Sequence, residues 1–287
     1  MQKRVFDKSV FVDEGLFRHN RTPIFEGSII WALRVPNKTE NRKILSTLYK
    51  KYWDIGFKTR LYDWLSPEAY RESLQRVADS IRLKQGEWLL DAGCGTGLLL
   101  SFLGDRLKMG GRYVGMDILP TGLASLKSRF NRLNLKGSIS GIQADLSGGL
   151  PLGDASVSCV AAHFSVYTLP EEKDRRQAVR EFWRVLKPGG LFITANPSQS
   201  YNAEKIIHSS LAQLQSQGRP WAFKKYGVYP LTFHLGLKHI ERQLKSGYWH
   251  GYRSEEMRDE VEQAGFAIEH SEAVYGGSGL LVIGRKP

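Results

Sequence analysis

The sequence predicts an α/β fold: a doubly wound, seven-stranded sheet, mostly parallel with its last strand antiparallel, carrying helices on both faces. Two observations predict it. Residues 88–100 run from a continuous apolar stretch through a glycine-rich turn into helical spacing, which is typical of a strand buried on both faces and its following helix. Strand-like apolar runs then alternate with amphipathic helical stretches as far as residue 196, as in βαβ units.

The elements follow in order. We expect helices at residues 40–56, 67–83, 98–108, 120–134 and 171–186, from one-sided apolar spacing and from start signals such as Ser66-Pro67. Buried strands are expected at residues 88–91, 112–118, 138–146, 155–162 and 191–195. A tight turn at 188–190 precedes the last of these. The chain should end with a helix that Ser254 caps and with antiparallel strands at 267–274 and 279–284.

Composition places the chain among ordinary globular proteins, because 41% of its 287 residues are hydrophobic and 24% are charged. No apolar run approaches the roughly 18 residues that a membrane-spanning helix needs. The N-terminal residues lack the apolar core of a signal peptide, so we expect a cytoplasmic protein. Two cysteines, Cys94 and Cys159, are too few for a disulfide framework, and no His, Asp and Glu cluster predicts a metal site.

The net charge of +12 is concentrated at two places. Residues 1–84 hold 17 basic and 10 acidic side chains, and residues 201–250 hold 7 basic and 2 acidic ones. Such an excess attracts an anionic substrate, an anionic membrane surface or RNA, or it serves solubility alone. Nucleic acid is the least favoured of these partners, because the sequence contains no recognised RNA-binding module.

The glycine-rich turn is the strongest functional signal. The glycines of Gly93-Cys94-Gly95-Thr96-Gly97 let the backbone turn sharply and approach a ligand, and Asp91 ends the preceding strand. Dinucleotide binders prefer glycine at the sixth position of this motif, where the chain has Leu98. An acid beside the turn favours a cationic ligand group over a pyrophosphate. A purely structural strand-to-helix turn remains the alternative.

This arrangement resembles motif I of the class I S-adenosylmethionine-dependent methyltransferases. The run Arg184-Val185-Leu186-Lys187-Pro188-Gly189-Gly190 is also a frequent mark of that family. The resemblance implies a Rossmann-like fold and S-adenosyl-L-methionine as the cofactor. It also implies cofactor contacts at the ends of the first and fourth strands and in the turn, at Asp91, Gly93, Cys94, Gly95, Gly97 and His163.

Acidic residues end the next two strands as well. Asp117 lies about 20 residues beyond the turn, where a carboxylate can accept from both ribose hydroxyls, and Ile118 would lie against the adenine. Capping of the next helix by Asp117 is the less favoured alternative. The resemblance further implies that Asp145 accepts from the exocyclic amine of adenine while the N–H of Leu146 donates to a ring nitrogen.

Upstream of the turn, Tyr52-Trp53-Asp54 and Tyr62-Asp63 resemble the paired Tyr-Asp segments that cover the cofactor in many small-molecule members of the family. The first copy departs from that pattern because Trp53 separates the tyrosine from the acid. The resemblance implies that Tyr52 contacts the cofactor, whereas the alternative is an aromatic helix that only packs on the sheet.

We divide the chain into an N-terminal arm with covering helices (1–66), a cofactor-binding core (67–196), a substrate-cap insert (197–250) and the end of the core (251–287). The insert interrupts the family pattern and is rich in aromatic residues and histidines. Helical spacing is present at 203–215 and 233–244. Large aromatics at the mouth of a crevice suit a planar or apolar substrate, or they form the insert's own core.

The predicted reaction moves a methyl group to a small aromatic or amphipathic acceptor, as in the quinone and sterol C-methyltransferases that the chain resembles. Orientation and desolvation supply most of the catalysis, and a base assists a hydroxyl or an acidic carbon. His163 and Tyr167 are the first candidates for catalytic residues, followed by His208 and His250. An RNA methyltransferase, a catalytically silent cofactor-binding protein and an NAD-dependent enzyme remain alternatives. The sequence leaves the oligomeric state open.

Overall fold

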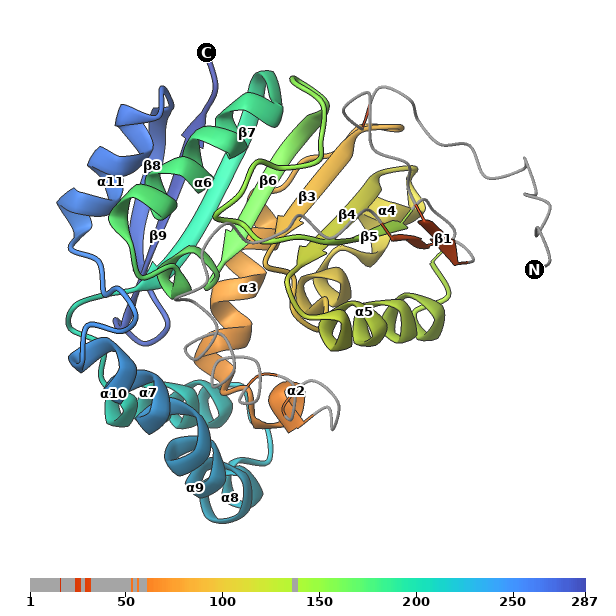
Figure 1. Ribbon diagram of the computed structural model, residues 1–287. Helices are drawn as coiled ribbons and strands as arrows, with labels where there is room; N and C mark the ends of the chain where they lie inside the picture. Colours follow the sequence, from red (N-terminus) through yellow and green to blue (C-terminus); the bar gives the residue numbers. More distant parts are fainter. Residues whose placement is uncertain are drawn as a thin grey trace, which may run out of the picture.

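The computed structural model (Figure 1) describes Leu16, residues 24–26 and 29–31, Trp53, Gly56, and residues 61–135 and 139–287. Of the expected helix at 40–56, only Trp53 and Gly56 belong to this described part, and both are helical; Tyr52 and Asp54 lie outside it. The expected N-terminal arm is described only in fragments. Two short antiparallel strands, β1 (Ile24–Glu26) and β2 (Ile29–Trp31), pair with each other apart from the main sheet.

The main sheet has seven strands in the order β5-β4-β3-β6-β7-β9-β8. The strands are β3 (Trp88–Ala92), β4 (Arg112–Asp117), β5 (Ile139–Gln143), β6 (Val157–His163), β7 (Leu186–Pro197), β8 (Ala267–Val274) and β9 (Gly279–Arg285). The first five in this spatial order are parallel, and β9 is antiparallel to both neighbours. The predicted fold class is confirmed.

Helices cover both faces of the sheet (Figure 1). The helices of the described chain are α2 (Leu61–Leu65), α3 (Glu68–Ser80), α4 (Gly104–Lys108), α5 (Pro120–Arg132), α6 (Glu172–Val185), α7 (Ala203–Ser216), α8 (Trp221–Phe223), α9 (Tyr229–Leu231), α10 (Lys238–Lys245) and α11 (Ser254–Gln263). Successive residues of β3 face opposite layers: Leu90 belongs to the core cluster that includes side chains of α6, and Leu89 belongs to the cluster that includes side chains of α3 and α5. Every residue of β3 is buried, as its apolar run predicts.

Three local predictions are wrong in detail. The helix expected at 98–108 is a 3₁₀ turn, η2 (Leu98–Phe102), followed by the short α4, because Gly97 and Gly104 weaken a continuous α-helix. Residues 188–190 form a bulge inside β7 rather than a free turn, since Gly189 and Gly190 exchange hydrogen bonds with Lys286 (N···O 2.8 and 3.0 Å). Ser254 is the first residue of α11 and not its cap; Glu256 accepts the N–H of Arg253 instead (3.2 Å).

The insert forms a helical cap beyond the carboxyl ends of the parallel strands, with α7 to α10 gathered below the sheet in Figure 1. The expected helix at 203–215 is α7. The second helix is longer than expected and begins at Trp221: two π-helical segments, η4 (Lys224–Val228) and η5 (Thr232–Leu237), join α8, α9 and α10. Helical spacing alone missed this part, because the wider π turns and Pro230 disrupt the 3.6-residue period. Within the described ranges, no helix has both the length and the apolar character needed to cross a bilayer.

Candidate active site

A cavity of about 200 Å³ lies at the carboxyl ends of β3, β4, β5 and β6. Nine of the predicted cofactor residues line it: Asp91, Gly93, Cys94, Gly95, Asp117, Ile118, Asp145, Leu146 and His163. Trp53, from the segment that resembles the family's covering motif, lines it as well. We call this cavity the cofactor cavity.

Gly97 does not line the cofactor cavity, so the structure gives no support to the expected cofactor contact there. Its backbone is left-handed (φ +70°), and a Cβ atom at this position would lie 2.2 Å from Cδ1 of Leu126. A side chain would therefore collide with α5. A glycine at this position lets the turn pack against α5, and the cofactor contact expected there stays a prediction.

Asp117 holds the glycine-rich turn in place. One of its carboxylate oxygens accepts the N–H of Gly95 (2.8 Å), and the other accepts the N–H of Leu119 at the start of α5 (2.8 Å). The side chain therefore joins the turn to the residue before α5, but it does not cap the helix, because the N-cap is Leu119 and no side chain caps it. Asp117 also lines the cofactor cavity. Burial raises the pKa of Asp117 to about 6.

Asp91 is almost completely buried, with 3% of its surface exposed. Burial raises the pKa of its carboxyl to about 7, while the hydroxyl of Tyr113, which donates to it, opposes this rise. A carboxylate in this environment lacks a charged partner among the described residues. A cationic ligand group beside Asp91 would supply one.

Asp145 lines the cavity just beyond the carboxyl end of β5. Its Oδ1 accepts the N–H and the hydroxyl of Ser147 (2.9 and 2.8 Å), which orients the carboxylate. The apolar residues Ile118 and Leu146 also line the cavity. The described residues that line the cavity include no Lys or Arg, so the donor set fits a nucleoside with a cationic tail better than a pyrophosphate.

His163 lies at the end of β6 with a defined tautomer. The Ser73 hydroxyl donates its single proton to the carbonyl of Tyr70 (2.8 Å), so it accepts from Nε2–H of His163 (2.8 Å). Nδ1 is buried and has no hydrogen-bond partner. Burial lowers the pKa of His163 to about 3. An imidazole with this lowered pKa is a poor general base, so the catalytic role of His163 stays a prediction that its buried environment does not favour.

We predict that His163 stays neutral throughout the physiological range. In a pH titration followed by NMR of its ring protons, its chemical shift should not change between pH 8 and pH 5, because protonation requires a charge in a dry site. The unfolded chain in urea is the reference, in which the same ring titrates with a pKa of about 6.5. A midpoint between 6 and 7 in the folded protein would contradict the assigned tautomer and environment.

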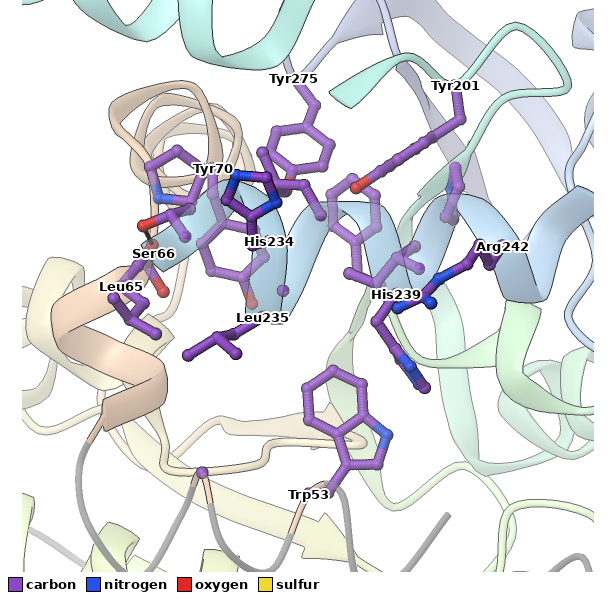
Figure 2. A pocket seen from close by; sticks show the side chains of 18 of the residues that line it. Trp53, Leu65, Ser66, Tyr70, Tyr201, His234, Leu235, His239, Arg242 and Tyr275 are labelled. Atoms are coloured by element: carbon purple, nitrogen blue, oxygen red, sulfur yellow. Dashed lines mark hydrogen bonds between the residues drawn. The ribbon is translucent and has the colours of Figure 1, made fainter. Parts of the chain in front are cut away.

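A second, larger cavity of about 440 Å³ adjoins the first. Trp53, Tyr70 and Phe164 line both cavities and so form their shared wall. Figure 2 shows Leu65 and Ser66 on one side of the second cavity and His239 and Arg242 on the other, with Trp53 below. Its remaining walls come largely from the cap, which supplies Pro197, Tyr201, Thr232, His234, Leu235, Gly236, Leu237 and Ile240. We call it the acceptor cavity.

Phe164 has a strained backbone at the shared wall. Its φ of +50° is uncommon for a residue with a side chain. Aromatic contacts hold its ring, with centroid distances of 4.9 Å to Tyr275 and 5.8 Å to Tyr70. Its N–H donates to the carbonyl of Ala195 on β7 (2.7 Å). Strain of this kind persists only where the surrounding packing determines the conformation, and it is concentrated at functional sites.

The other predicted catalytic residues are scattered. Tyr167 is buried and lines the acceptor cavity. His208 is exposed on α7, and Nε2 of His250 pairs with Glu256 (2.7 Å); neither lines either cavity. Sequence reasoning missed Tyr70 and Tyr275, whose only signal was an isolated aromatic residue.

Comparisons with known proteins agree with this geometry. A family model described as "Methyltransferase domain" matches residues 90–194. The chain is 30% identical over 178 residues to the 2-phytyl-1,4-naphtoquinone methyltransferase of Thermosynechococcus vestitus, a match that covers 62% of this chain and 71% of the relative. It is 26% identical over 185 residues to the ubiquinone/menaquinone biosynthesis C-methyltransferase of Klebsiella pneumoniae subsp. pneumoniae, with 64% of each chain covered.

Some curated relatives are therefore matched over less than two thirds of their own length. The crystal structure of a SAM-dependent methyltransferase from Aquifex aeolicus superimposes with a TM-score of 0.51 at 19% identity, over 75% of this chain and 89% of that one, and supports the fold. With the seven-stranded sheet and the acidic cavity at its carboxyl edge, these matches show that the chain belongs to the class I S-adenosylmethionine-dependent methyltransferases, with S-adenosylmethionine as its cofactor.

Proposed function

We propose that this protein methylates a small, apolar, ring-bearing acceptor held in the acceptor cavity. The observation that carries the proposal is the shared wall: Trp53, Tyr70 and Phe164 border the cofactor cavity on one side and the acceptor cavity on the other. When bound, the cofactor supplies a sulfonium-activated methyl group that a nucleophile attacks in line. The chain itself orients the two ligands and excludes water.

The cofactor-binding residues have separable tasks in this proposal. Asp91 binds the ammonium group of the cofactor, and Asp117 accepts hydrogen bonds from its ribose hydroxyls. Asp145 and the N–H of Leu146 form hydrogen bonds with the edge of the adenine ring. The structure supports this assignment by placing the three carboxylates at the ends of neighbouring strands on one cavity. Gly93 lines the cofactor cavity, and a Cβ there would lie 2.3 Å from Cβ of Ser165, so the turn needs glycine at this position.

The acceptor class follows from the walls of the second cavity. Tyr70, Phe164, Tyr167, Tyr201 and Tyr275 offer aromatic faces and edges, and no described lining residue is acidic. Its volume of about 440 Å³ lies within the usual range for small-molecule sites, roughly 300–1,000 Å³. One relative is named for a naphthoquinone and another for the biosynthesis of ubiquinone and menaquinone, and a planar ring of that kind suits this lining.

Filling the acceptor cavity from its wall tests the proposal. Gly236 lines this cavity, and a Cβ there meets no atom within 4 Å. Gly236→Leu should therefore leave the fold intact while its side chain occupies space that the acceptor needs. We expect KM for a reduced naphthoquinone to rise about tenfold or more, since steric overlap of this size costs 1–3 kcal/mol. The affinity for S-adenosylhomocysteine should not change.

The assay uses methyl-labelled S-adenosylmethionine with a cell extract divided into an organic phase and an RNA fraction. Label in the organic phase, reduced by Gly236→Leu, supports the proposal. Gly227→Leu is the matched control, because Gly227 lies in the same helical stretch, is exposed, and lines neither cavity. Label confined to RNA, or equal loss in both variants, would contradict it.

A further inference from the structure

The helical stretch from Trp221 to Leu237 has two unlike faces. Its inner face is buried: Val228, Tyr229, Thr232 and Leu237 are each exposed by 3% or less. Thr232 donates its hydroxyl to the carbonyl of Leu65 (2.8 Å), which fastens this face to α2. The stretch is therefore held in one orientation, and its outer face is fixed with respect to the acceptor cavity.

The outer face carries large apolar side chains in the open. Phe223, Tyr226, Leu231 and Leu235 are exposed by 67%, 72%, 45% and 53%. Their spacing of three to five residues places them along one side of the helix, and we call them the outer stripe. They make up four of the seven large hydrophobic side chains that are exposed in the described chain. Such a concentration on one short segment marks a binding surface.

The charge around the outer stripe has one sign. Residues 205–240 contain no Asp or Glu, and residues 217–250 hold six basic side chains and one acidic one. Glu68 of α3 pairs with two of the basic groups, Arg219 and Lys224. Nζ of Lys225 lies 5.2 Å from the ring centre of Tyr226, so a cation stands directly beside the apolar surface.

The outer stripe adjoins the acceptor cavity. Leu235 belongs to both, and His234 beside it also lines the cavity. Figure 1 shows α8 and α9 at the end of the cap farthest from the sheet, so no element of the described core covers this face.

We propose that the outer stripe docks the protein on an anionic lipid bilayer, with the mouth of the acceptor cavity at the membrane surface. Apolar and aromatic side chains flanked by lysines are the composition that inserts into the headgroup region. Two copies of this chain joined through the stripe would bring their basic groups together, which disfavours self-association. The delivery of an apolar acceptor from the bilayer rests on the proposed function, whereas docking itself does not.

Flotation of the full chain with vesicles tests docking, without acceptor or cofactor. We expect binding to vesicles of equal parts phosphatidylglycerol and phosphatidylcholine, and little binding to phosphatidylcholine alone. Phe223→Ser and Tyr226→Ser should each reduce the partition coefficient about tenfold, because each removes an aromatic side chain from the membrane interface. Lys225→Glu should reduce it by a similar factor, about tenfold, through charge reversal.

Matched controls are available on other surfaces. Met109, exposed by 68%, is the control for the apolar changes as Met109→Ser, and Lys173→Glu on α6 is the control for the charge. Because neither Phe223 nor Tyr226 lines a cavity, methylation of an acceptor in free solution should persist in both variants. A variant can therefore lose vesicle binding and keep methyl transfer, so the two proposals are tested separately.

Three results would overturn the proposal. The first is that the native chain does not float with anionic vesicles. The second is that the stripe variants and the controls float equally. The third is a concentration-dependent dimer in light scattering, without lipid, that Phe223→Ser abolishes, since this would assign the stripe to a second copy of the chain.

Discussion

Asp91→Asn should abolish most of the cofactor affinity while it makes the free protein more stable at pH 8. Removing one partner of a buried, charged hydrogen bond costs about 2–5 kcal/mol, so the Kd of S-adenosylhomocysteine should rise about thirtyfold or more. The affinity of the native protein should fall below pH 7, because protonation of Asp91, whose pKa is about 7, removes the charge that holds the ammonium group.

The gain in stability follows from the same pKa. Burial raises the pKa of Asp91 from 3.8 to about 7 in the folded protein, so the folded state is penalised increasingly from pH 4 to pH 7. An amide avoids the buried charge and still accepts from Tyr113. At pH 8 the free energy of unfolding should therefore increase by about 2–4 kcal/mol, and at pH 4 it should not change.

Calorimetric titration with S-adenosylhomocysteine and urea unfolding at the two pH values measure these effects. Asp105→Asn on α4 is the control, since this carboxylate is exposed and lines neither cavity. An Asp91→Asn protein that binds S-adenosylhomocysteine as tightly as the native one would remove Asp91 from the proposed cofactor site.

Arg129→Met should destabilise the fold by about 3 kcal/mol or more, because it breaks a largely buried ion pair and leaves one charge without a partner. The guanidinium of Arg129 pairs with Asp63 of α2, donates to the carbonyl of Thr96 (3.0 Å) and donates to the Ser101 hydroxyl (2.9 Å). Asp63 also accepts from the Thr96 hydroxyl (2.6 Å). One side chain thus joins α5, α2 and the glycine-rich turn.

Urea unfolding of Arg129→Met measures the loss, and Arg132→Met is the control because Arg132 is exposed on the same helix. Adding Asp63→Asn to Arg129→Met should restore part of the stability, since the buried charge disappears. The affinity for S-adenosylhomocysteine should fall as well, because Thr96 belongs to the turn that lines the cofactor cavity. Equal stability of the two arginine variants would show that the network contributes nothing to the fold.

Burial is a property that the sequence did not predict for these charged residues. Arg132 and Asp105 are exposed, whereas Arg129 and Asp91 are buried. The sequence shows that these side chains are charged and in which element each lies. It does not show which of them the neighbouring elements cover. Burial decides their pKa values and their energetic weight, and burial depends on elements that are distant in the chain.

Sequence alone determined the order of most helices and strands along the chain and the acidic edge of the cofactor cavity. These features depend on local patterns: apolar runs, a glycine-rich turn, and the acids Asp91, Asp117 and Asp145 at successive strand ends. Parallel strands joined by helices bring their carboxyl ends to one edge, so local signals were enough to predict that these acids meet there.

Only the tertiary structure decided the rest of the site. Ser73 on α3 sets the tautomer of His163, which lies 90 residues away in the chain. Tyr70, Phe164 and Tyr275 meet from three separate elements to border the acceptor cavity, and Gly97 proves to pack against Leu126. No periodic pattern encodes such contacts, because they arise from the packing of side chains between elements rather than from the conformation of any one of them.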